Sequence, residues 1–136
     1  MTRVQGAIDA IMKTAVVIYR DDDGTSPLRQ WLLTLQAKAR AECVAALGLL
    51  ENYGHELRRP YCENLGDGIY ELRVKFRRVN LRMLYFFHER RAVVVTHGFA
   101  KEREIPPREI ELAKARMEAL KANPEDHTYP SQPEEG

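Results

Sequence analysis

The sequence predicts a small α+β fold, and two patterns predict it. From Tyr70 to Phe76 every second residue is apolar and the residues between are charged, which is typical of a half-buried strand. Between residues 36 and 53 apolar residues recur three and four positions apart, which is typical of an amphipathic helix. The chain has 136 residues, a length that suits one domain.

The N-terminal part predicts one strand and two helices. Residues 14–20 form a β-branched run that indicates a strand. Ser26 and Pro27 have the chemistry of an N-cap followed by proline at the first helical position, so a first helix is expected through residues 28–35. The second helix is expected from Gln36 to Tyr53, and Gly54 ends it.

The remaining chain predicts a loop, three strands and a last helix. The loop is expected at residues 55–68, the strands at 68–76, 79–88 and 91–99, and the helix at 105–120. The apolar stripe of this helix contains Ile110, Ala113, Met117 and Leu120. We expect one domain over residues 1–122 and a disordered acidic tail over residues 123–136, because the tail has no apolar face.

Composition limits the classes of protein to consider. The net charge is only +1, but residues 58–103 contain eleven Lys or Arg against five acids, an asymmetry that suits an anionic partner. No secretion signal or membrane span is apparent, so a cytoplasmic protein is expected. Cys43 and Cys62 lack metal-ligand spacing and are expected to be reduced thiols near the core. No metal and no cofactor are expected.

The predicted register of the first hairpin places two arginines opposite each other. If Arg77 and Arg78 form the turn, Leu72 faces Met83 on a wholly apolar side. The same register puts Arg73 directly opposite Arg82, and two like charges facing across a ladder destabilise a sheet. Folding alone therefore does not explain the pair. One hypothesis is an external anion, such as a phosphate, between them; the alternative is a structural arginine paired with Glu71 or a helix carboxylate.

The third strand extends the cationic side of this hairpin. If Glu89 and Arg90 form its turn, Val94 joins the packed side, and His97 and Phe99 join the cationic side with His97 beside Arg82. A shift by one residue would reverse this assignment.

Several short motifs, in order, resemble a known protein family. They are Gly-Ile-Tyr-Glu-Leu-Arg at 68–73, Leu-Arg-Met-Leu-Tyr at 81–85, His-Gly-Phe-Ala-Lys at 97–101, and Pro-Arg-Glu-Ile at 107–110 with Ala113. Together they resemble the phage-like HigB branch of the RelE/ParE toxin superfamily over about residues 14–120. The resemblance implies a twisted antiparallel sheet of about four strands, two N-terminal helices on one face, and a C-terminal helix.

The resemblance also implies a function. It implies the toxin of a type II toxin–antitoxin system, neutralised by a helix-turn-helix antitoxin. Most relatives of the HigB and RelE kind are endoribonucleases that cleave messenger RNA on the ribosome without a metal. The main alternatives on the same fold are a ParE-like gyrase inhibitor and a non-catalytic nucleic-acid- or antitoxin-binding module, because fold does not fix function.

Cleavage by the 2′-hydroxyl of RNA needs proton transfer and cations that stabilise the phosphorane. Arginine suits the second role because it binds phosphate bidentately. The candidate catalytic residues are Arg73, Arg82, His97, Lys101 and Arg103.

The candidate RNA-binding residues are Lys75, Arg77, Arg78, Asn80 and Phe99. His97 is either a proton shuttle or a half-buried histidine bonded to backbone, and Phe99 either stacks on a base or belongs to the core. RelE itself has a tyrosine a few residues past the strand-end arginine. Residues 104–110 contain none, so the resemblance does not identify the general base.

Overall fold

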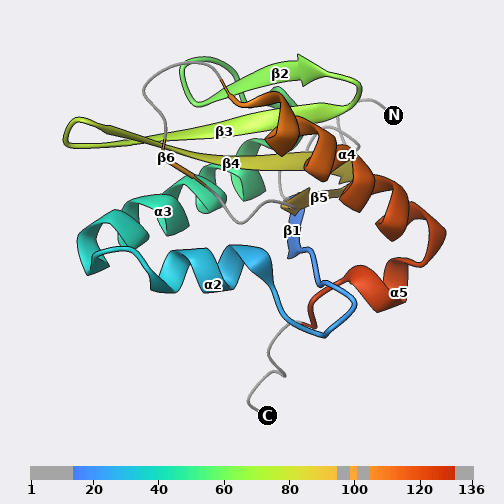
Figure 1. Cartoon of the computed structure of the whole chain (residues 1–136). Helices are drawn as coiled ribbons and strands as arrows, with labels where there is room; N and C mark the ends of the chain where they lie inside the picture. The colour runs from blue at the N-terminus through green and yellow to red at the C-terminus, as the bar shows by residue number, and fades with distance from the viewer. Residues whose placement is uncertain (1–13, 95–98, 101–104, 131–136) are drawn as a thin grey trace, which may run out of the picture.

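The computed structural model describes residues 14–94, 99–100 and 105–130 (Figure 1). The helices are α2 (Pro27–Leu33), α3 (Ala37–Tyr53), α4 (Pro107–Ala122) and α5 (Pro124–His127), with a 3-10 turn η1 at Gly54–Glu56. The strands are β1 (Ala15–Ile18), β2 (Cys62–Gly66), β3 (Ile69–Phe76), β4 (Val79–His88), β5 (Arg91–Val94) and β6 (Phe99–Ala100).

Within the described residues the sheet has the order β1-β5-β4-β3-β2, and β6 also pairs with β4. The pairs β2–β3, β3–β4, β4–β5 and β4–β6 are antiparallel. The predicted α+β class is confirmed. The sheet is mixed rather than wholly antiparallel, however, because β1 runs parallel to β5.

Strand β2 lies inside the segment that the sequence predicts as a loop. Its residues, Cys-Glu-Asn-Leu-Gly, show no clear alternation, and it is a strand because it pairs with the edge of β3, with Cys62 opposite Leu72. Asp67 and Gly68 connect the two strands with φ of 54° and 84°. Positive φ at both central residues is what a tight hairpin turn requires, and Asp-Gly favours it. The loop prediction is therefore wrong for residues 62–66.

The predicted start of the first helix and the predicted end of the second are confirmed, whereas the first helix ends at Leu33, two residues earlier than predicted. Ser26 Oγ accepts a hydrogen bond from Arg29 N at 3.1 Å, and Pro27 begins α2. Gly54 ends α3 with φ of 50°. A Cβ at position 54 would collide with the Thr14 hydroxyl, so this site requires glycine for its space as well as for its backbone conformation.

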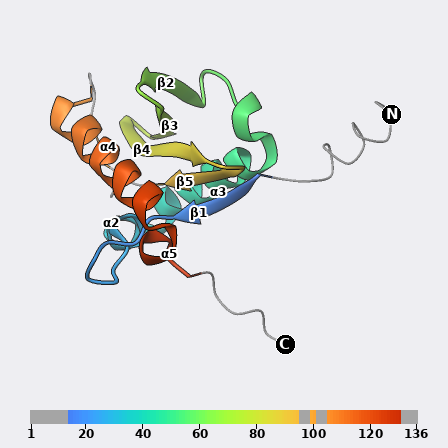
Figure 2. The same ribbon diagram turned by 90° about the vertical axis from the view of Figure 1, so that its right-hand side faces the viewer.

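The sheet carries helices on both faces, as the two views in Figures 1 and 2 show. Helices α2 and α3 pack on one face, where Leu72 and Met83 of the hairpin meet Ala46 and Leu50 of α3. The apolar side predicted for Leu72 and Met83 thus lies in the core, and the predicted register of β3 on β4 is confirmed. Cys43 and Cys62 are free and buried, and burial raises the pKa of Cys43 to about 11.

Helix α4 covers part of the opposite face. Ala113, Met117 and Leu120 pack there against a second cluster that includes Ile69, Leu84 and Phe86. The sequence predicts this side of the hairpin as solvated and charged. That prediction is wrong for the half far from the β3–β4 turn, where Ile69, Leu84 and Phe86 are buried. None of the helices among the described residues has the length and apolar character needed to span a bilayer.

The C-terminal segment packs on the domain as far as Pro130. Arg20 N donates to His127 O at 2.8 Å, and Tyr129 N donates to Ile18 O at 2.7 Å. The His127 ring is buried and stacks on Tyr19, with ring centroids 5.3 Å apart. The predicted disordered tail is therefore wrong for residues 123–130, because backbone pairing with β1 supplies contacts that composition does not reveal. Residues 131–136 lie outside the described residues.

Replacement of Leu72 by alanine should lower the free energy of unfolding by about 2–5 kcal/mol, the usual cost of a large-to-small change in a core. Leu72 is fully buried. Leu33→Ala is the matched control, because Leu33 is 72% exposed and should change that free energy by less than about 0.5 kcal/mol. Urea unfolding measures both. Equal effects in the two variants would contradict the position of the core.

Truncation after Ala122 should lower the free energy of unfolding by about 2–4 kcal/mol, because two backbone hydrogen bonds and a buried aromatic contact are lost. Truncation after Pro130 keeps these contacts and is the control. Thermal and urea unfolding of both proteins measure the difference. Equal stability of the two truncated chains would show that residues 123–130 do not pack on β1.

Candidate functional site

Arg73 and Arg82 lie directly opposite each other on β3 and β4, as predicted. Arg73 N donates to Tyr61 O at 2.8 Å, so its N–H points away from β4. Arg73 and Arg82 therefore form a non-hydrogen-bonded pair, the kind whose side chains lie closest. Their repulsion needs compensation.

Glu71 supplies that compensation from inside the protein. Arg73 Nε donates to Glu71 Oε1, and an Arg82 terminal N donates to Glu71 Oε2, both at 2.6 Å. The Glu71 side chain is 0% exposed, whereas Arg82 is 13% and Arg73 41% exposed. The anion between the arginines is thus the Glu71 carboxylate. The alternative hypothesis, a structural pair with Glu71, describes this arrangement, and no external anion is needed to hold the arginines together.

The ion pairs continue onto β2. Glu63 lies opposite Glu71, and a second Arg73 nitrogen donates to Glu63 Oε2 at 3.2 Å. Arg59 forms an ion pair with the other oxygen of Glu63. The hydrogen bond from Arg59 lowers the pKa of Glu63, and the hydrogen bond to Glu71 raises the pKa of Arg73. We call this set the charge network: Arg59, Glu63, Arg73, Glu71 and Arg82. Opposite charges alternate along it, and three arginines against two glutamates leave a net charge of +1.

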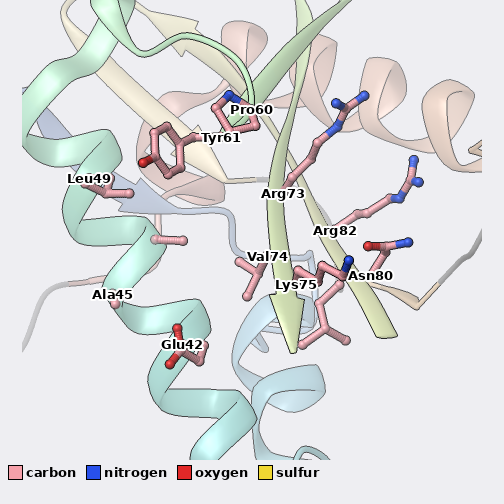
Figure 3. Close-up of a pocket in the computed structure, with 12 residues that line it drawn as sticks. Glu42, Ala45, Leu49, Pro60, Tyr61, Arg73, Val74, Lys75, Asn80 and Arg82 are labelled. Atoms are coloured by element: carbon pink, nitrogen blue, oxygen red, sulfur yellow. The ribbon is translucent and has the colours of Figure 1, made fainter. Parts of the chain in front are cut away.

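The charge network does not use every donor and cation on this side of the hairpin. Arg82 Nε is buried and finds no hydrogen-bond acceptor among the described residues. Lys75 and Asn80 lie opposite each other, one step nearer the turn, on the same face of the hairpin as Arg73 and Arg82. In Figure 3 the two arginines point away from α3. We call these four residues the cationic face: Arg73, Lys75, Asn80 and Arg82. Arg77 and Arg78 are exposed at the turn next to it.

The other predicted site residues are placed only in part. His97, Lys101 and Arg103 lie outside the described residues. The backbone of Phe99 pairs with Arg82, and the side chain of Phe99 is outside the described part of the chain. The β4–β5 ladder, with Tyr85 opposite Val94, would bring His97 opposite Arg82 if it continued unbroken. Phe99 stands opposite Arg82, and the predicted position of His97 beside Arg82 falls outside the described residues.

The cationic face has the chemistry of a phosphate site. Guanidinium groups bind phosphate oxygens bidentately and stay charged at every physiological pH. Glu71 fixes the positions of both arginines through two short charge-assisted bonds, which limits their side-chain motion. Within the described residues no group of His, Cys, Asp or Glu side chains is arranged to hold a metal.

Sequence reasoning assigned no functional role to Glu71, although the signal was available. Residues two apart on a strand share a face, and Glu71 and Arg73 are two apart. The diagonal from Glu71 to Arg82 across the predicted register is within reach of long side chains. Glu63 could not be found in this way, because β2 was not predicted.

Replacement of Glu71 by glutamine should lower the free energy of unfolding by about 3–5 kcal/mol, because it leaves the largely buried charge of Arg82 without its partner. Glu63→Gln is the matched control on the neighbouring strand. Glu63 is partly exposed, so its loss should cost no more than about 1 kcal/mol. Urea unfolding compares the two. A small and equal cost would show that Arg82 does not depend on Glu71.

The family comparison covers this region of the chain. No curated protein matches the chain. The family model described as Phage derived protein Gp49-like (DUF891) matches residues 30–118, which include α3, the β3–β4 hairpin and the whole charge network. That family is associated with toxins of the RelE and HigB type. Because the match covers more than half of the sequence, the chain belongs to the Gp49-like family of phage-derived proteins.

Proposed function

We propose that this protein is the toxin of a type II toxin–antitoxin system and a metal-independent, ribosome-dependent mRNA endoribonuclease. Membership of the Gp49-like family supports a toxin. The proposal of nuclease activity is supported by the cationic face, where Arg73, Arg82 and Lys75 lie on one side of the hairpin. A helix-turn-helix antitoxin is the proposed partner, with the ribosome and mRNA as the other two.

In the proposed reaction the RNA 2′-hydroxyl oxygen attacks the adjacent phosphorus, and the bond to the departing 5′-oxygen breaks. The 2′ proton goes to a base, and the 5′-oxygen takes a proton from an acid. Arg82 and Arg73 stabilise the extra negative charge of the phosphorane through the guanidinium nitrogens that Glu71 does not occupy. Because the charge network keeps a net charge of +1 and Lys75 adds another, the face still attracts a phosphate.

The remaining roles belong to residues that sequence analysis singled out. His97 is the proposed proton shuttle, and Lys101 and Arg103 are proposed to contact the reacting phosphate. The proposed contacts to flanking RNA come from Lys75, Arg77, Arg78, Asn80 and Phe99. Lys75, Arg77 and Arg78 are exposed cations, Asn80 is a polar residue on the same strand face as Arg82, and Phe99 is an aromatic residue; these types of side chain bind single-stranded RNA.

A double variant separates the structural role of Arg82 from its proposed catalytic role. Arg82→Ala alone would leave Glu71 buried beside one cation fewer and would confuse lost folding with lost catalysis. Glu71→Gln with Arg82→Gln removes both charges together, so the free energy of unfolding should stay within about 1 kcal/mol of the natural protein. Cleavage of mRNA on translating ribosomes should fall about 10²-fold or more. Mapping of mRNA 5′ ends measures it.

The control variant is Lys121→Ala, which removes a half-exposed cation at the end of α4 and should cleave normally. Full cleavage by the folded double variant would contradict the proposal that Arg82 contacts the reacting phosphate. If the natural protein leaves mRNA intact on ribosomes but inhibits DNA supercoiling by gyrase, the ParE-like alternative replaces the nuclease.

A further inference from the structure

We propose that the open edge of β3, together with the groove between β3 and α3, docks an extended peptide in which acidic and apolar residues alternate. The groove has a volume of about 700 Å³ and is lined by residues of α3, β3 and β4 and by Pro60 and Tyr61. The walls of the groove, the backbone groups of the strand edge and the charges beside it each indicate a property of the peptide that would bind.

The edge begins where β2 stops covering β3. Moving along β3 toward the β3–β4 turn, the last residue pair between β2 and β3 is Cys62 with Leu72. One residue further, Tyr61 O accepts a hydrogen bond from Arg73 N. Tyr61 N donates to Arg58 O at 3.0 Å, so the chain turns away from β3 there. In the described part of the chain, residues 74–76 of β3 pair with β4 only. Because Arg73 N–H points away from β4 and strand geometry repeats every two residues, the N–H and C=O of Lys75 face the open edge.

The two walls of the groove differ in chemistry. The α3 side is apolar apart from Glu42, with Ala45 and Leu49 from the helix, Val74 from β3, and Tyr61 above them (Figure 3). Tyr61 is 49% exposed, and half-exposed aromatics beside a pocket are common anchors in interfaces. The opposite side is the cationic face.

A strand laid along this edge would use both walls. Successive side chains of a strand point to opposite faces, so alternate residues would enter the apolar groove and the others would meet Arg73 and Lys75. Addition of a strand to a sheet edge draws affinity from backbone hydrogen bonds and specificity from alternate side chains. Glu42 lines the α3 side of the groove, so the acidic residues of the partner belong on the cationic side alone.

A second copy of this chain fits the edge poorly. Antiparallel pairing of two β3 edges would bring the cations at positions 73 and 75 of both copies together, and like charges facing each other destabilise a ladder. Lysine on an edge strand is a common protection against self-pairing. The charges therefore favour an acidic partner over a second copy.

Docking of such a peptide would also affect the cationic face. Its carboxylates would neutralise Arg73 and Lys75, so peptide and RNA would exclude each other. This consequence rests on the proposed function, whereas docking itself does not require RNA cleavage.

The test uses a short fluorescein-labelled peptide in which valine and glutamate alternate. It should bind saturably by anisotropy and slow hydrogen exchange at the Lys75 amide. Lys75→Glu should weaken binding at least about tenfold, because it places a like charge opposite the glutamates. Ala45→Gln should also weaken it by filling the groove. Ala41→Gln is the matched control, an exposed alanine on α3 that does not line the groove.

Two further peptides act as ligand controls: one with the valines and glutamates in separate blocks, and one with lysine in place of glutamate. Both should bind at least about tenfold more weakly than the alternating peptide. Absence of saturable binding up to about 1 mM, unchanged exchange at Lys75, or equal binding by Ala45→Gln would overturn the proposal. Protection of Lys75 by a single-stranded RNA oligomer instead would assign the edge to RNA. The proposed nuclease is measured separately by mRNA cleavage, so either idea can fail alone.

Discussion

The two short hydrogen bonds from Glu71 to Arg73 and Arg82 are the interaction on which the site depends. An antiparallel ladder that places two arginines in a non-hydrogen-bonded pair creates repulsion at the closest side-chain spacing that a sheet offers. A carboxylate on the same face of β3 offsets the repulsion and also forms an ion pair with the largely buried guanidinium of Arg82. Because Glu71 is fully buried, its carboxylate depends on both cations as partners, so the three charges hold one another in position.

The rest of the fold is arranged around this cluster. Helix α4 packs on Ile69, Leu84 and Phe86, on the sheet face that also carries Glu71. Strand β2 brings Glu63 beside Arg73 and then ends, which leaves the outer part of β3 without a strand on that side in the described residues. The same hairpin therefore combines a buried ionic cluster, an exposed cationic face and an open strand edge. A phosphate and an acidic strand would compete for Arg73 and Lys75.

Local pattern was enough to predict the elements whose residues alternate or repeat regularly. The β3–β4 register was predictable because a one-residue slip would expose Leu72 and Met83 and bury charges. The short strand β2 and the packing of His127 on Tyr19 were not, because each depends on a partner far away in sequence. For the site, sequence analysis correctly predicted that Arg73 lies opposite Arg82 and that an anion lies between them. Sequence analysis considered Glu71 as a partner but did not choose it, because the full burial of Glu71 depends on the tertiary structure and not on local sequence pattern.

Nitrogen-15 NMR of the arginine side chains tests most directly whether Glu71, rather than an external anion, holds the pair. In anion-free buffer the Nε–H of Arg73 should be a sharp, slowly exchanging signal, because it donates to a buried carboxylate. Addition of inorganic phosphate should shift the signals of both Arg73 and Arg82 while that bond persists. If the Nε–H of Arg73 exchanges as fast as a free arginine and becomes ordered only when phosphate is added, the internal bridge is not formed in solution. The anion between the arginines would then be external.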